Sequence, residues 1–320
     1  MSEKIAIIGG SGFIGTVLTK QLLEQGFNVV NGDKNTSQKF PEHHILCDVR
    51  DQNSLNSVIK GADVVVNLAA EHRDDVSPIS LYYDVNVDGA KNICDVADRH
   101  GVKKIIFTSS VAIYGFAKGA SNEETPINPF NDYGQSKADA ETVYEEWLAN
   151  KEGRQLQVIR PSVVFGKGNR GNVYNLLKQV SSGKFLMIGN GLNHKSMSYV
   201  ENIAGFIKFQ VELDEHHGIY NYADMPDFDV NTLVCHIRKS MGKSATIGFR
   251  LPHWLGMAAG MTFDVLAFIS RRTFPISKIR VDKFCADTMV NANKAHNSGY
   301  KPTIDFAEGL EKTIKYEFLK

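Results

Sequence analysis

The 320-residue sequence has few cysteines, no excess of charge of either sign and no long apolar run that is free of charge. Its four cysteines lie far apart without paired spacing, which argues against a disulfide framework or a zinc site and predicts reduced, buried thiols. They are Cys47, Cys94, Cys235 and Cys285. The 36 Lys and Arg cancel the 36 Asp and Glu, so no overall field would draw the protein to nucleic acid or to an anionic membrane. With 42% hydrophobic and 22% charged residues, the composition is that of a globular protein and excludes general disorder.

Export and membrane signals are also missing. The chain enters a strand pattern at Lys4 to Ile8 without the charged leader and apolar stretch of a signal peptide, so we expect a cytoplasmic protein. The most apolar later segment, Trp254 to Ser270, carries Asp264 in its middle, where insertion into a bilayer would cost about 3 kcal/mol. We expect no transmembrane span and favour a buried helix or a helix at a surface seam over peripheral membrane contact through residues 254–270.

The histidine pairs at 43–44 and 216–217 lack acids at ligand spacing, so we expect no metal site.

Short apolar runs alternate with helical patterns over the first 165 residues. Such runs, apolar at consecutive positions and separated by amphipathic stretches such as Phe13 to Gln25, predict strands that are covered on both faces. The predicted strands are Lys4 to Ile8, Phe27 to Val30, His44 to Cys47, Asp63 to Leu68, Lys103 to Thr108 and Leu156 to Ile159. The pattern therefore predicts an α/β fold with a doubly wound parallel sheet of the Rossmann type.

The alternation of strand and helix patterns ends beyond Pro161. Longer helical patterns and Gly-rich breaks there predict a smaller, mostly helical substrate lobe. Ile219 to Ala223 reads as a strand that returns to the sheet. We therefore expect a dinucleotide-binding domain over residues 1–165 with a returning segment at about 200–224, and a substrate lobe over 166–199 and 225–320. Asp305 and Glu308 have capping-box spacing ahead of a last helix that reaches about Phe318.

A glycine-rich turn follows the first predicted strand and opens the first predicted helix. The segment from Gly9 to Gly15 reads Gly-Gly-Ser-Gly-Phe-Ile-Gly, with Phe13 and Ile14 inside it. Gly9 permits a tight turn, Gly12 lets a pyrophosphate approach the backbone, and Gly15 allows the helix to pack closely on the strand. The free N–H groups of the helix start suit an anion. A dinucleotide is the expected ligand, and a glycine turn without a ligand is the disfavoured alternative.

Acidic residues follow the second and third strands. Asp33 lies eighteen positions beyond Gly15, where an acid is expected to bind the adenosine ribose hydroxyls and to disfavour a 2′-phosphate. This favours NAD over NADP, although Lys34 could offset the repulsion, and an ordinary loop Asp is the alternative. After the third strand, Asp48 is placed for the adenine amine and Val49 for the ring face.

Tyr133 and Lys137 are four residues apart, which puts a phenol and an ammonium on one helix face. The pair alone is weak evidence, because lowering a phenol pKa from about 10 to about 7 needs roughly 4 kcal/mol of preferential stabilisation. The hydroxyl-rich segment Thr108 to Gly115 and the segment Asn67-Leu68-Ala69-Ala70 both follow predicted strands. Ligands of open α/β sheets bind outside these strand ends, so all these features should share one crevice with the glycine turn.

With these residues assembled, the chain resembles the extended short-chain dehydrogenase/reductase family, and within it the nucleotide-sugar epimerase/dehydratase group that includes UDP-galactose 4-epimerase and UDP-sugar 4-ketoreductases. The motifs that carry the resemblance are the glycine turn, Asp48-Val49, Asn67-Leu68-Ala69-Ala70, Asn86, Ser110 before Tyr114, and Tyr133 with Lys137. The resemblance implies that Tyr133 is the catalytic acid/base, that Lys137 binds the nicotinamide ribose and lowers the phenol pKa, and that Ser110 binds the reacting sugar oxygen. It also implies that Leu68, Ala69, Ala70 and Asn86 line the cofactor site.

The family's reactions differ at a few positions. Its dehydratases generally carry an Asp-Glu pair where this chain has Val111 and Ala112, which transfer no proton, so a 4,6-dehydratase is disfavoured. The first hypothesis is an NAD-dependent nucleotide-sugar 4-epimerase working through a 4-keto sugar. The alternative is a nucleotide-4-keto-sugar reductase, favoured by Val163, which stands where the epimerases usually have an Asn. A non-catalytic NAD-binding protein is disfavoured by the intact Ser110, Tyr133 and Lys137.

The resemblance assigns the substrate side more loosely. Lys195 occupies a position where relatives often place an Arg for the nucleotide diphosphate, Arg280 is a second candidate, and Asn172 could bind the sugar or the diphosphate. Each has an ordinary structural alternative. The expected substrate is a nucleotide sugar that is linked to UDP, either a hexose or an N-acetylhexosamine. Relatives commonly pair through helices like Leu81 to His100 and Tyr133 to Asn150, so we expect a homodimer.

Overall fold

The computed structural model describes residues 3–319 except 74–75, 117–118 and 272–276. The strands are β1 (Lys4–Ile8), β2 (Asn28–Asp33), β3 (His44–Leu46), β4 (Val64–Asn67), β5 (Lys104–Thr108), β6 (Gln155–Pro161), β7 (Val163–Phe165), β8 (Met187–Ile188), β9 (His194–Tyr199), β10 (His217–Tyr222), β11 (Asp224–Asp229) and β12 (Arg250–Leu251). The helices are α1 (Phe13–Glu24), α2 (Gln52–Ile59), α3 (Ser80–Tyr83), α4 (Gly89–His100), α5 (Asp132–Ala149), α6 (Asn172–Ser181), α7 (Val200–Glu212), α8 (Val230–Ser240), α9 (His253–Ser270), α10 (Lys278–Cys285), α11 (Asn293–Asn297) and α12 (Phe306–Phe318).

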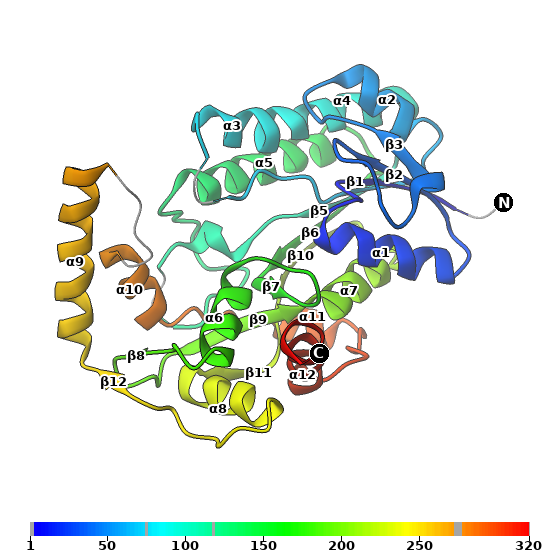
Figure 1. The fold of residues 1–320 in the computed structure, drawn as a ribbon. Coiled ribbons are helices and arrows are strands. Elements are labelled where there is room, and N and C mark those ends of the chain that lie inside the picture. Colours follow the sequence, from blue (N-terminus) through cyan, green and yellow to red (C-terminus); the bar gives the residue numbers. More distant parts are fainter. Residues whose placement is uncertain (1–2, 74–75, 117–118, 272–276, 320) are drawn as a thin grey trace.

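Seven parallel strands form the central sheet in the order β10-β6-β5-β4-β1-β2-β3. The strand order reverses direction on either side of β1, which is the doubly wound arrangement that the sequence predicts. Helices cover both faces, with α2, α4 and α5 on one side and α1 and α7 on the other (Figure 1). The predicted Rossmann sheet is confirmed.

Alternating side chains of the strands build the two cores of the sheet. In β1, Ala6 and Ile8 pack in the core shared with α2, α4 and α5, whereas Ile5 and Ile7 pack against α1 and α7. Because both faces are buried, the strand is apolar at every position, which explains the continuous runs in the sequence. This burial fixes the register of the strands and therefore the edge at which all of them end.

The remainder of the chain forms two small sheets, β11-β9-β7 and β12-β8, with α6, α8 and α12 around a core of their own. The strand β10 returns to pair with β6 in the large sheet, and α7 packs on α1. The boundaries that we expect for the two domains stay a prediction. Within the described part of the chain, no helix is long and apolar enough to cross a membrane.

Three expectations fail in detail. Asp305 is the N-terminal flanking residue of α12, but its side chain makes no capping hydrogen bond. The thiols of Cys235 and Cys285 are only half-buried, although Cys47 and Cys94 are buried as expected. The segment at 254–270 forms a helix, α9, with only two buried residues, so of the two expected placements the buried one fails and the one at the surface agrees with the structure.

Candidate active site

The glycine turn adopts a shape that only small residues permit. Gly9 has a positive φ of 84°, and a Cβ atom there would lie 2.6 Å from the backbone nitrogen of Ala69. A Cβ atom on Gly15 would lie 2.4 Å from the carbonyl oxygen of Gly9, so α1 can approach the turn only at a glycine. The turn is thereby pressed between α1 and the segment that follows β4.

The start of α1 offers donors to an anion. Gly12 is the flanking residue of the helix, no side chain caps it, and its first turn contains no acid. The Oγ atom of Ser11 is buried and has no hydrogen-bond partner among the described residues. Free N–H groups, the positive end of the helix dipole and an unpaired hydroxyl fit the pyrophosphate of a dinucleotide.

Asp33 lies against this turn at the end of β2. Its Oδ2 atom accepts a hydrogen bond of 3.1 Å from the backbone of Ser11, and Oδ1 accepts one of 2.8 Å from Asn35. The carboxylate is thus held beside the glycine turn, where the sequence places the ribose contact. Phe13 and Ile14, by contrast, pack partly into the core of the smaller lobe and so tie the turn to that lobe.

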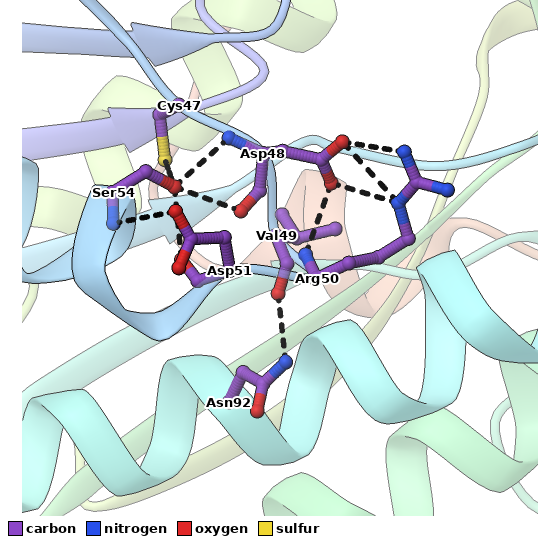
Figure 2. Close-up of polar contacts among 7 residues, drawn as sticks. All are labelled: Cys47, Asp48, Val49, Arg50, Asp51, Ser54 and Asn92. Atoms are coloured by element: carbon purple, nitrogen blue, oxygen red, sulfur yellow. Dashed lines mark hydrogen bonds and ion pairs between the residues drawn. The ribbon is translucent and has the colours of Figure 1, made fainter.

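Asp48 and Val49 form the next part of the crevice, after β3 (Figure 2). The carboxylate of Asp48 accepts hydrogen bonds from the guanidinium of Arg50 at 2.6 and 3.0 Å, and this contact holds the pKa of Asp48 below its usual range. Val49 is buried, and its carbonyl accepts a 3.0 Å hydrogen bond from Asn92 of α4. The sequence reasoning missed Arg50, which contacts the residue predicted to bind the adenine, although Arg50 is adjacent to the motif.

Asn86 organises the loop after β4. Its Nδ2 atom donates to the carbonyl of Glu71 at 3.0 Å and to Ser136 of α5 at 2.9 Å, and its Oδ1 atom accepts from the Glu71 backbone at 2.8 Å. Both amide protons are therefore used within the protein. These bonds position the segment Leu68 to Ala70 relative to α5, and Asn86 as a direct cofactor contact stays a prediction.

Tyr133 and Lys137 lie in the first turns of α5, which begins after Asn131, whose side chain accepts a 2.9 Å hydrogen bond from Gly134. The Lys137 ammonium donates a 2.6 Å hydrogen bond to the carbonyl of Thr108 and lies 4.3 Å from the centre of the Phe107 ring. Burial lowers the pKa of Lys137 to about 7. The helix thus brings the ammonium to the end of β5.

Ser110 meets the phenol at the same strand end. Burial raises the pKa of Tyr133, and a hydrogen bond with Ser110 acts in the opposite direction. Ser110 also accepts a 3.1 Å bond from Ala112 and so caps the short turn Val111–Tyr114. The structure therefore brings together Ser110, Tyr133 and the Lys137 amine beside the strand end, as expected from the sequence.

The substrate candidates are spread over the smaller lobe. Lys195 in β9 is half-buried, and its Nζ atom donates to the carbonyls of Lys283 and Ala286 at 2.9 and 2.6 Å, so it holds the end of α10. Burial lowers its pKa to about 8. Arg280 lies in the first turn of α10, and Asn172 is the exposed first residue of α6. No contact among these three side chains joins them into one diphosphate site, and their roles stay predictions.

A buried ion pair beneath the site escaped the sequence reasoning. Arg160 of β6 binds both carboxylate oxygens of Glu141 at 2.6 and 3.0 Å, and its Nη1 atom donates to the Tyr114 hydroxyl at 2.8 Å. Tyr114 in turn donates to Asn221 at 2.7 Å. The only signal in the sequence is that Glu141 follows Lys137 by four residues on the same helix. The pair fixes α5 against the sheet.

Comparisons with known proteins agree with this geometry. The family model described as "NAD dependent epimerase/dehydratase family" matches residues 5–223. The chain is 48% identical over its whole length to the N-acetyl-alpha-D-glucosaminyl-diphospho-ditrans,octacis-undecaprenol 4-epimerase of Escherichia coli O157:H7, and covers 96% of it. It is 27% identical to the UDP-glucose 4-epimerase of Vibrio cholerae, over 98% of this chain and 95% of that protein.

Solved structures share the fold. The UDP-glucuronic acid 4-epimerase from Bacillus cereus in complex with NAD superposes with a TM-score of 0.76 at 21% identity, covering 99% of this chain and all of that one. The match of the family model to most of the chain, and the full-length relative, decide the family. The chain is therefore an enzyme of the NAD-dependent epimerase/dehydratase family, in the extended short-chain dehydrogenase/reductase group, and its cofactor is NAD.

Proposed function

We propose that the chain is a 4-epimerase that inverts C4 of a hexose or N-acetylhexosamine linked through a diphosphate to its carrier. The observation that carries this proposal is the 48% identity, over the full chain, to a 4-epimerase of an N-acetylglucosaminyl diphosphate. The grouping of Ser110, Tyr133 and Lys137 supports it chemically. The UDP-linked substrate that the sequence suggests shares the sugar diphosphate with the substrate named for that relative.

NAD, when bound, supplies a reversible acceptor for a hydride. This chain's own residues move the proton and place the sugar. Tyr133 takes the proton of the hydroxyl at sugar C4 and later returns it, while Ser110 holds the same oxygen. The ammonium of Lys137 favours the phenolate, and a phenolate in turn favours the charged form of the buried amine. The two groups therefore titrate as a coupled pair.

A nucleotide-4-keto-sugar reductase would use the same three residues. Val163, 40% exposed after β6, is the observation that favours it, because an epimerase usually has an Asn there. The proposals differ in their need for cofactor from solution: an epimerase regenerates its bound cofactor in each turnover, whereas a reductase consumes it.

The test is to incubate the purified protein with UDP-N-acetylglucosamine and, separately, with N-acetylglucosaminyl diphosphoprenol, and to follow the sugar signals by NMR. Appearance of the 4-epimer without added reduced cofactor is expected with at least one substrate. Product that forms only from a 4-keto sugar, with matching consumption of NADH, would replace the epimerase by the reductase.

We further propose that the chain forms a homodimer through the helices around α4 and α5 and works in the cytoplasm. The dimer rests on the pairing that is common among relatives, and the location rests on the expectation from the sequence. They are independent of the catalytic assignment.

A further inference from the structure

The helix α9 projects from the smaller lobe and packs only along one side. Figure 1 shows it at the edge of the molecule, next to α10 and away from the large sheet. Its two buried residues are glycines: Gly256 packs against Ile188 and Val281, and Gly260 packs against the backbone of Lys278. Large side chains on the side opposite these glycines stay exposed among the residues that the structure describes.

That opposite side, which we name the outer face of α9, is apolar. It consists of Trp254, Met261, Val265, Phe268 and Ile269, which are 67, 48, 58, 87 and 72% exposed. Their spacing by three, four and seven residues aligns them along a helix about 27 Å long. So many large apolar side chains on one exposed helix mark a surface that another phase or protein covers.

The charges around the outer face favour an anionic surface as its occupant. Asp264 is the sole Asp, Glu, Lys or Arg within α9, and its Oδ2 atom accepts a 3.0 Å hydrogen bond from the backbone of Lys278. The adjoining sequence 271–280 contains four Lys and Arg and no acid. Of these four, Arg271, Lys278 and Arg280 are described and exposed. Arg271 follows the last residue of α9, whereas Lys278 lies beside its middle, next to Gly260 and Asp264. An apolar helix face with cations beside it suits the interface of a bilayer that contains anionic lipid.

The α9–α10 pair also lies next to the segment that precedes α5 and Tyr133. The ammonium of Lys283 in α10 is 5.1 Å from the centre of the Phe130 ring, and Phe130 packs on Phe116 with ring centres 4.4 Å apart. Phe130 precedes Tyr133 by three residues and is, like Phe116, partly exposed. A substrate whose sugar reaches Tyr133 can therefore extend its carrier toward α10 and α9.

We propose that the outer face of α9 docks on an anionic membrane surface and that the carrier of the sugar diphosphate is a polyprenyl lipid in that membrane. The identity of the carrier rests on the proposed epimerase function, since the relative at 48% identity is named for an undecaprenol-linked sugar. The docking itself rests on the exposed apolar residues and the neighbouring cations. The helix lies along the surface, because no described helix can span it.

Docking is tested with the full chain and sucrose-loaded vesicles that contain no substrate. Wild-type protein should sediment with vesicles of phosphatidylcholine and phosphatidylglycerol at 7:3, and less with phosphatidylcholine alone. The double variant Val265→Glu, Phe268→Glu should lower the partition coefficient at least about tenfold. Tyr316→Glu, which places one such charge on an exposed aromatic position of α12, should leave the partition coefficient unchanged. Equal partition of all three proteins would overturn the docking.

The carrier is tested in the same variants by two epimerisation assays. With a water-soluble N-acetylglucosaminyl diphosphate of short prenyl chain, the α9 double variant should match wild type; with the undecaprenyl compound in vesicles, its rate should fall about tenfold. A fall in both assays, or in neither, contradicts the proposed carrier. Loss of epimerisation by the wild type in every assay would instead refute the proposed function. If the wild type binds no vesicles and the double variant changes from dimer to monomer, the outer face of α9 is instead an interface between two copies of the chain.

Discussion

Burial affects Tyr133 and Lys137 in opposite directions. It keeps the phenol of Tyr133 protonated, and it favours the uncharged form of the Lys137 amine. Burial raises the pKa of Tyr133 and lowers that of Lys137 to about 7. These two shifts oppose transfer of the phenol proton to the amine, because they hold the pKa of Tyr133 above and that of Lys137 below its usual value. A phenolate at pH 7 therefore needs more than the roughly 4 kcal/mol that an unshifted phenol would need, and we expect Ser110, the Lys137 ammonium and the bound cofactor to supply this stabilisation together.

We predict that Tyr133→Phe lowers turnover at least about a hundredfold, since it removes a positioned proton-transfer group and leaves the ring in place. Cofactor content, measured after denaturation of the purified variant, should stay near that of wild type. Tyr316→Phe, a change of the same size on an exposed residue, is the control. Undiminished turnover would remove Tyr133 from the mechanism.

Asp33 sets the choice of cofactor in our second prediction. Asp33→Asn removes the charge that repels a 2′-phosphate and keeps one acceptor oxygen, so it retains the hydrogen bond from the backbone of Ser11 or of Asn35 but not both. The ratio of NAD to NADP affinity should fall about tenfold or more. Parallel titrations of both cofactors measure it, with the exposed Asp88→Asn as the matched change elsewhere. An unaltered ratio would show that Asp33 does not face the ribose.

The placement of site residues was predictable where a motif fixes the spacing. The four-residue interval of Tyr133 and Lys137 and the position of Ser110 after a strand suffice to place them together. Arg160 and Glu141 could not be paired in advance, because they meet through the packing of α5 on β6 and lie nineteen residues apart. The same holds for Lys195, whose bonds to α10 depend on the path of a distant segment.

At the scale of elements, Asp224 ties β9, α7 and the β10–β11 connection together. Its carboxylate accepts hydrogen bonds from the Tyr199 backbone at 2.5 Å and from Asn202 at 3.0 Å, and the Tyr222 hydroxyl adds a third at 3.2 Å. Burial nevertheless dominates and raises the pKa of Asp224 to about 6.

The third prediction concerns stability against pH. Between about pH 4 and 6 the folded protein keeps the proton of Asp224 that the unfolded chain releases, so this residue's contribution to stability is lost as the pH rises through that window. Asp224→Asn does not titrate. The stability of the variant relative to wild type should therefore rise over this window, by up to about 3 kcal/mol.

Urea unfolding of both proteins at a series of pH values measures this difference, with Asp88→Asn as the control. A difference that is independent of pH would show that the carboxyl of Asp224 ionises normally in the folded state.

Strands were more predictable than helix ends. A strand that is buried on both faces, such as β1, is apolar at every position, so its first and last residues can be predicted from the sequence. The capping box expected at Asp305 has the right spacing, yet the side chain does not bond to the helix, because spacing does not fix a rotamer. The sequence left the placement of α9 open between the core and the surface for a related reason: an apolar helix has the same sequence pattern whether or not other parts of the chain cover it.

At the scale of the whole molecule, pairing through α4 and α5 is the fourth prediction. The full chain should sediment at twice its 35.5 kDa mass. Thr142→Arg, a large charged change at an exposed position of α5, should halve that mass, whereas Phe268→Glu on α9 should not. A wild-type protein that stays monomeric at micromolar concentration would contradict the pairing.

The pair of glycines that seats α9 on α10 has a consequence for kinetics. A catalyst held flat against lipid meets its reactant by lateral diffusion in two dimensions, so its velocity follows the mole fraction of that reactant among the lipids and hardly depends on bulk volume. Adding vesicles without reactant should then slow the reaction by surface dilution. If α9 docks as proposed, a bulkier residue at Gly256 would displace the helix from Ile188, weaken the contact with the bilayer and so reduce this surface dilution.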